Sequence, residues 1–174
     1  MGTISKKMCM IGDFGVGKTS LIRRFVDRQF SDQYLSTVGV KISRKSVEIG
    51  EGEKRDVQLL IWDLEGHTKF KAIAPSYLQG AGGALVVADV TRSETIERIP
   101  EHLKLFSSVN PKGLIIIALN KADLAEEEKL EKLLEIARYP EYERVVATYA
   151  TSAKEGTSVD EIFHTLAAKM LEPT

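Results

Sequence analysis

The sequence is poor in several features that would place it in special classes of protein. Its single cysteine, Cys9, excludes a disulfide within the chain and suits a reducing compartment. The longest apolar runs, residues 82–90 and 113–119, are far shorter than the roughly 20 residues that span a bilayer. The first residues, MGTISKK, contain no apolar signal segment. These absences predict a cytoplasmic protein with no transmembrane segment.

Charge of neither sign dominates the sequence. The 24 lysines and arginines oppose 25 aspartates and glutamates, giving a net charge of −1. Such a balance argues against general electrostatic binding to nucleic acid or to an anionic membrane. The 174 residues are 43% hydrophobic, and they include no repeat, low-complexity tract or linker. We therefore expect a single globular domain over residues 1–174, monomeric by default.

Strand and helix patterns alternate along the chain. Short apolar or alternating runs predict strands at 6–12, 38–49, 56–63, 82–90, 113–120 and 144–150. Apolar residues at helical spacing predict helices at 18–27, 93–106, 126–138 and 158–170. We expect Pro100 to kink the second helix, and Ser158 with Glu161 to form a capping box on the last. The pattern predicts an α/β fold: a mostly parallel sheet with one antiparallel hairpin strand and helices on both faces.

The segment GDFGVGKTS, residues 12–20, matches the pattern G-x-x-x-x-G-K-[ST] between a predicted strand and a predicted helix. Its glycines allow successive N–H groups to surround phosphate oxygens, Lys18 adds a positive charge, and the Thr19 hydroxyl can ligate Mg²⁺. A glycine turn with no ligand would not require the Lys-Thr pair. The predicted phosphate-binding residues are Asp13, Phe14, Gly15, Val16, Gly17, Lys18, Thr19 and Ser20.

Two later motifs, NKAD (120–123) and TSAKEG (151–156), predict recognition of a base. The Asp123 carboxylate can accept hydrogen bonds from the N1–H and N2–H₂ groups of guanine, whereas adenine offers no such pair of donors. We expect Asn120 and Lys121 to brace this loop and to cover the base. A backbone N–H between Ser152 and Lys154 can reach the guanine O6, which adds Ser152, Ala153 and Lys154 to the predicted site. Alone, NKAD could be an ordinary polar loop with Asp123 as a helix cap.

With these three motifs in this order, the chain from Lys7 to about Met170 resembles the Ras-like small GTPases, most closely the Rab branch. The resemblance implies a P-loop NTPase fold with a six-stranded, mostly parallel sheet. It also implies a molecular switch that binds GTP or GDP with Mg²⁺ and hydrolyses GTP slowly without help.

The resemblance assigns roles to four further residues. Phe30 occupies the place of an aromatic that packs against the guanine edge. Thr37, in YLSTVGV, corresponds to the residue whose hydroxyl meets Mg²⁺ only when the γ-phosphate is present. Asp63 matches the aspartate that holds Mg²⁺ through water, and Gly66 the backbone N–H that senses the γ-phosphate. The metal residues are then Thr19, Thr37 and Asp63, and the residues that carry hydrolysis are Lys18, Thr37, Gly66 and His67.

Two residues depart from the family pattern. His67 stands where most relatives have the glutamine that orients the attacking water. Either a partner orients the imidazole for catalysis, or hydrolysis has been weakened and His67 is a surface residue. Phe14 occupies a P-loop position that is small in Ras and Rab proteins. Its ring either crowds the space of an incoming arginine or turns outward.

The resemblance also implies partners: an exchange factor, an activating protein and effectors that bind the switch regions. Trp62 and Tyr77 match two aromatic residues that Rab proteins present to effectors, and Ile42 takes the third position; ordinary packing is the alternative. The final residues KMLEPT contain no cysteine for lipid attachment, so we expect membrane contact only through partners or a tail missing from this sequence. A pseudo-GTPase that binds nucleotide with little turnover is the alternative function, whereas NKAD disfavours an ATP-using enzyme.

Overall fold

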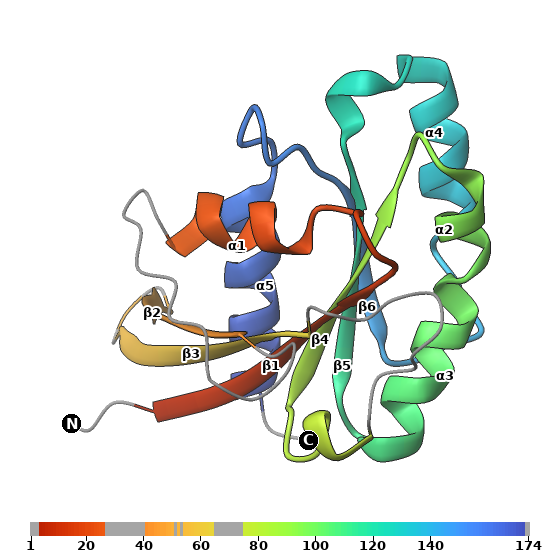
Figure 1. The fold of residues 1–174 in the computed structure, drawn as a ribbon. Helices are drawn as coiled ribbons and strands as arrows, with labels where there is room; N and C mark the ends of the chain where they lie inside the picture. The colour runs from red at the N-terminus through yellow and green to blue at the C-terminus, as the bar shows by residue number, and fades with distance from the viewer. Residues whose placement is uncertain (1–3, 27–40, 51, 53, 65–74, 173–174) are drawn as a thin grey trace.

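The computed structural model describes residues 4–26, 41–50, 52, 54–64 and 75–172. A six-stranded sheet with the order β2-β3-β1-β4-β5-β6 forms its centre (Figure 1). Strand β2 pairs with β3 in the antiparallel sense, and the other neighbours are parallel, which confirms the predicted sheet. The strands are β1 (Ile4–Gly12), β2 (Lys41–Ile49), β3 (Arg55–Asp63), β4 (Gly83–Asp89), β5 (Leu114–Asn120) and β6 (Val145–Ala150).

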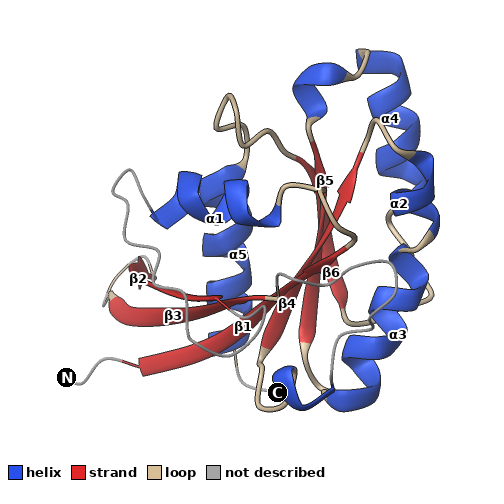
Figure 2. Cartoon of the chain, in the orientation of Figure 1, coloured by secondary structure: helices blue, strands red, loops and turns tan. Residues whose placement is uncertain are grey.

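Helices cover both faces of the sheet. Helices α1 and α5 lie on one face, and α2, α3 and α4 lie on the other (Figures 1 and 2). Their bounds are α1 (Lys18–Val26), α2 (Ser93–Glu97), α3 (Ile99–Val109), α4 (Glu127–Ile136) and α5 (Val159–Leu171). None of these helices is long and apolar enough to cross a membrane.

Side chains of the central strands alternate between two apolar cores. Met8 and Met10 of β1 face the core under α1 and α5, where Phe25 stacks on Phe163 with ring centroids 4.0 Å apart. Cys9 belongs to the second core, under α2, α3 and α4. Because successive side chains of a strand point to opposite faces, one apolar run supplies both cores.

The predicted helix over 93–106 is divided into two by the structure. Helix α2 ends at Glu97 and α3 begins at Ile99, with Arg98 between them. Pro100 lies in the first turn of α3, where a missing backbone N–H costs nothing, but it cannot continue a preceding helix. A kink at Pro100 was predicted, but the structure has two separate helices with Arg98 at their junction.

The predicted capping box at the last helix is wrong. Ser158 has φ 56°, in the left-handed region, and its side chain makes no capping hydrogen bond. A capping residue needs an extended backbone for its hydroxyl to reach back to the first turn. The tight turn at Gly156 (φ 84°), whose carbonyl accepts from Val159 N, sets the entry into α5 instead.

A matched pair of isoleucine substitutions tests which helix face carries the stability. Ile162 of α5 is 0% exposed, whereas Ile136 of α4 is 62% exposed. We expect Ile162→Ala to lower the free energy of unfolding by about 2–5 kcal/mol through lost burial and a residual cavity. Ile136→Ala should change it by less than about 0.5 kcal/mol. Urea unfolding at one saturating nucleotide concentration measures both, and equal losses would contradict the assignment of the core.

Candidate nucleotide-binding site

The polar motifs meet at the carboxyl ends of three neighbouring parallel strands. Strand β1 ends at Gly12, β4 at Asp89 and β5 at Asn120, and Asp89 and Asn120 are partners in the β4–β5 register. The P-loop follows β1 and leads directly into α1. In an open α/β sheet this edge is where ligands bind.

Lys18, the first residue of α1, folds back over the start of the P-loop. Its Nζ donates hydrogen bonds to the carbonyl oxygens of Gly12 (2.9 Å) and Asp13 (3.1 Å). The residue is only 6% exposed. These carbonyls fix the ammonium group inside the loop, where a phosphate would meet it.

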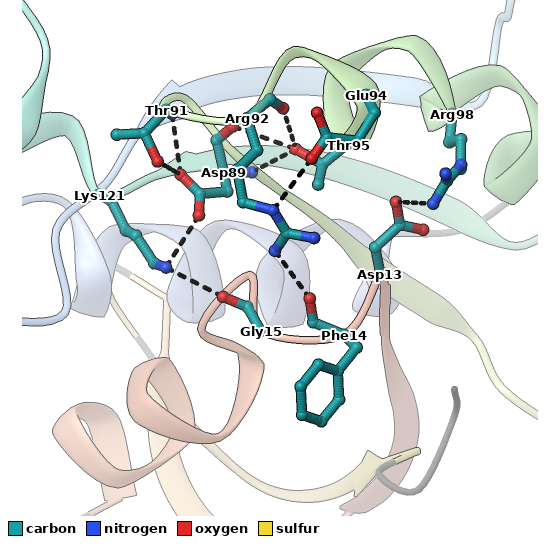
Figure 3. Close-up of polar contacts among 10 residues, drawn as sticks. All are labelled: Asp13, Phe14, Gly15, Asp89, Thr91, Arg92, Glu94, Thr95, Arg98 and Lys121. Atoms are coloured by element: carbon teal, nitrogen blue, oxygen red, sulfur yellow. Dashed lines mark hydrogen bonds and ion pairs between the residues drawn. The ribbon is translucent and has the colours of Figure 1, made fainter. Parts of the chain in front are cut away.

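Two cationic side chains donate hydrogen bonds to the next two carbonyls of the P-loop, those of Phe14 and Gly15. Arg92 Nη1 donates to the carbonyl oxygen of Phe14 (2.8 Å), and Lys121 Nζ donates to that of Gly15 (3.0 Å) (Figure 3). Within one peptide unit the C=O and the N–H point in opposite directions. Holding the carbonyls on this side therefore turns the following N–H groups the other way, as a phosphate-binding nest requires.

Asn120 contacts the P-loop near its C-terminal end, at Val16. Its Nδ2 donates to the carbonyl oxygen of Val16 (2.9 Å), and its Oδ1 accepts from the Thr151 hydroxyl (3.1 Å). Gly17 has φ 101°, and a β-carbon there would collide with the Asn120 amide. Glycine is thus required at this position both for its φ and for the close approach. Asn120 therefore joins the end of β5 to the P-loop, and its predicted role beside a base stays a prediction.

Asp89 is a site residue that the sequence analysis missed. Its carboxylate is fully buried and lies 2.8 Å from Lys121 Nζ, and it accepts hydrogen bonds from the N–H (2.8 Å) and the hydroxyl (2.6 Å) of Thr91 (Figure 3). Burial acts to raise the pKa of Asp89, but these hydrogen bonds outweigh it, so the pKa lies below its ordinary value. A charged Asp89 therefore orients Lys121 toward the P-loop. An aspartate ending an apolar strand run was the available signal.

The two base-recognition motifs are joined to each other. The Ser152 hydroxyl donates to Asp123 Oδ1 (2.8 Å) and accepts from the N–H of Glu155 (3.0 Å). Ala122 N donates to the carbonyl oxygen of Thr151 (2.9 Å). Asp123 is thereby fixed in a half-buried position. The neighbouring Ala153 packs on the core, and Lys154 is exposed.

The structure brings together two of the three predicted metal residues. Thr19 Oγ1 donates to Asp63 Oδ2 at 2.6 Å, and Asp63 is fully buried. A hydroxyl and a carboxylate are the hard oxygen donors that Mg²⁺ prefers, with waters and phosphate oxygens completing the octahedron. The described residues include no group of three or more His, Cys, Asp or Glu able to hold a metal ion. A site with one carboxylate fits Mg²⁺ bound together with phosphates.

Four predicted site residues, Phe30, Thr37, Gly66 and His67, lie outside the described residues, so their roles stay predictions. Phe14 is described and is 71% exposed. Its ring points away from the polar contacts of its own backbone (Figure 3). The exposed ring agrees with an outward orientation, and the crowding of an incoming arginine by this ring stays a prediction.

Ile42, Trp62 and Tyr77 are each partly buried against the second core. Ile42 and Trp62 are partners in the β2–β3 register. Lys7 Nζ lies 3.8 Å from the centroid of the Trp62 ring and donates to the carbonyl oxygen of Gln79 (2.7 Å). Burial lowers the pKa of Lys7. The cation covers part of Trp62. Packing against the core is thus observed for these residues, and contact with a partner stays a prediction.

The P-loop lies between a strand and a helix, and the loops of the two predicted base-recognition motifs lie at the same edge of the sheet. This arrangement defines a P-loop nucleotide-binding protein. Comparison with known proteins narrows this class. The profile of the family described as "Ras family" matches residues 7–172. The chain therefore belongs to the Ras family of small GTPases.

Several curated relatives are Rab and Ypt proteins. The chain is 36% identical to the GTP-binding protein ypt5 of Schizosaccharomyces pombe, over 97% of this chain and 79% of that protein. It is 36% identical to Ras-related protein Rab-13 of Canis lupus familiaris, over 95% and 79% of the two chains. Identity to Ras-related protein Rab5 of Nicotiana tabacum is 34%, over 96% and 82%.

Proposed function

We propose that this chain is a Rab-like molecular switch that binds GTP or GDP with Mg²⁺ and hydrolyses GTP slowly on its own. The observation that carries the proposal is the joining of two motifs. Asn120 and Lys121 of the base-recognition loop donate to the carbonyls of Val16 and Gly15 in the P-loop. The distance between the phosphate and base subsites is fixed by these bonds, as recognition of one whole nucleotide demands.

Guanine is the base that suits the second subsite. Asp123 is held by Ser152 with its carboxylate half-buried, and it provides acceptors for N1–H and N2–H₂. The backbone from Ser152 to Lys154 supplies the N–H for O6. Phe30, which lies outside the described residues, would pack against the edge of the base.

Thr19 and Asp63 would hold Mg²⁺, joined by Thr37 when the γ-phosphate is present. The ion would neutralise the charge that develops on the phosphates during transfer. Loss of the γ-phosphate would release Thr37 and the Gly66 backbone, and this change would be the switch. Exchange factors, activating proteins and effectors would read it at a surface that includes Ile42, Trp62 and Tyr77.

Hydrolysis would use Lys18 for charge, Thr37 and Gly66 for positioning, and His67 in the place of the water-orienting glutamine. An imidazole accepts a hydrogen bond from water only through an unprotonated nitrogen, and its reach differs from that of a carboxamide. Relatives without a cis arginine hydrolyse GTP on the order of 10⁻⁴ per second, and we expect no faster rate here. His67 and Phe14 also favour a second candidate, a nucleotide-binding interaction module with little turnover.

Single-turnover hydrolysis of bound GTP, measured between about pH 5.5 and 8.5, tests the proposal. We expect His67→Gln to accelerate the reaction and to remove its pH dependence. His164→Gln, at an exposed histidine of α5, is the matched control and should leave the rate unchanged. The expected ceiling is on the order of 10⁻⁴ per second. A tenfold higher rate without any partner would contradict the claim of slow hydrolysis. No turnover in either His67 form, with GTP retained, would favour the binding module.

A further inference from the structure

The P-loop contains a carboxylate, Asp13, close to where the phosphates are expected. Asp13 is 7% exposed, and its own carbonyl oxygen accepts from Lys18. A negative charge here repels a polyphosphate, and the repulsion is strong because little water screens it. A loop that binds anions can tolerate this residue only if its charge is compensated.

Two side chains from the α2–α3 side of the sheet contact the Asp13 carboxylate. Arg98 Nη1 lies 2.7 Å from Oδ2 (Figure 3), and His102 Nε2 lies 3.0 Å from Oδ1. Both carboxylate oxygens are thus engaged. Arg98 stands at the α2–α3 junction and His102 four residues later, so they lie one above the other on the same helix face.

The two partners supply different interactions. His102 is buried, and burial lowers its pKa more than the hydrogen bond and charge of Asp13 raise it; Lys18 lowers it further and Glu101 raises it. A neutral imidazole donates its Nε2–H to Asp13 and adds no charge. The positive charge therefore comes from Arg98, whose side chain is 44% exposed.

We propose that Arg98 and His102 are positioning residues of the nucleotide site, which neutralise and orient Asp13 so that the P-loop binds a polyphosphate. The inference rests on the proposed nucleotide binding and adds two residues that touch no part of the ligand. Without Arg98, the Asp13 charge acts on the phosphates. The affinity lost then rises with the number of phosphates, because each adds negative charge.

Displacement titrations with GTP, GDP and GMP in Mg²⁺ test this inference. We expect Arg98→Gln to weaken GDP binding on the order of tenfold, GTP binding more and GMP binding least. Adding Asp13→Asn to Arg98→Gln removes the uncompensated charge and should restore most of the loss. His102→Leu should weaken GDP binding more than His102→Gln, which keeps an N–H donor.

Arg138→Gln is the matched control, because it also removes one arginine, from a surface pair with Glu135 just beyond α4. Affinities of Arg98→Gln equal to those of this control would overturn the inference. So would an equal loss for all three nucleotides, or a loss that Asp13→Asn leaves in place, since either marks a general structural defect. Unfolding midpoints identify such a defect directly. If the unsubstituted protein binds no guanine nucleotide, the proposed function fails and the inference fails with it.

Discussion

Asp123→Asn is expected to weaken GDP binding by at least about 10³-fold and to increase the affinity for xanthosine diphosphate. The asparagine oxygen can keep the hydrogen bond from Ser152, which in the present structure goes to Asp123 Oδ1 at 2.8 Å. Its NH₂ group then faces the base in place of an acceptor. Guanine meets it with another donor, N2–H₂, whereas xanthine offers a carbonyl oxygen at that position.

Asp56→Asn is the matched control for this exchange, since Asp56 is an exposed residue near the start of β3. Displacement of a bound guanine nucleotide by GDP, xanthosine diphosphate and ADP measures all three proteins, including the unsubstituted chain. Equal affinities of the Asp123 and Asp56 variants for GDP would refute the guanine subsite. A gain for ADP instead of the xanthine nucleotide would refute its hydrogen-bond pattern.

Lys18→Ala is expected to weaken binding of GDP and GTP by about 10²- to 10³-fold. Lys18 is nearly buried and is fixed by the carbonyls of Gly12 and Asp13, so its ammonium meets the phosphates with little competing water. Removing one partner of a buried ion pair, here the lysine of the lysine–phosphate pair, costs roughly 3–5 kcal/mol. We expect Lys18→Arg to restore little, because a planar guanidinium does not fit a point charge bound between two carbonyls.

Calorimetric titration with GDP measures this loss, and Lys129→Ala, on the exposed side of α4, is the control for a removed lysine. Binding by Lys18→Ala within threefold of the control would mean that Lys18 makes no contact with the phosphates. Without nucleotide, Lys18→Ala should change the free energy of unfolding far less than it changes the free energy of GDP binding. The reason is that burying the lysine is itself costly.

The parts of the site that the sequence predicted are those fixed by local chain geometry. The P-loop residues follow one another between a strand and a helix, so their spacing alone implies a phosphate nest. Asn120 and Asp123 follow a strand end, and the parallel sheet brings them to the same edge as the P-loop. The prediction of an α/β sheet held because strand and helix patterns alternate along most of the chain, and the resemblance supplied the six-stranded form.

The parts that it did not predict depend on contacts between distant segments. Arg98 and His102 meet Asp13 across 85 and 89 residues of sequence, and Arg92 meets Phe14 across 78. Helical periodicity marks one face of α3 as apolar, but it does not say which polar residue at the edge of that face meets the P-loop. Their position follows from the break at Arg98 and from the packing of α3 on the sheet. The failed capping box at Ser158 has a local origin instead, since the tight turn at Gly156 set the backbone of Ser158.

Competition between GTP and ATP for the unsubstituted protein, in Mg²⁺, tests the central claim most directly. The claim is that the P-loop and the Asp123 loop together form one guanine nucleotide site. We expect GTP to displace bound GDP at comparable concentration, and ATP to fail even at about a 10³-fold excess. Displacement by ATP at concentrations similar to those of GTP, or no binding of either nucleotide, would contradict it.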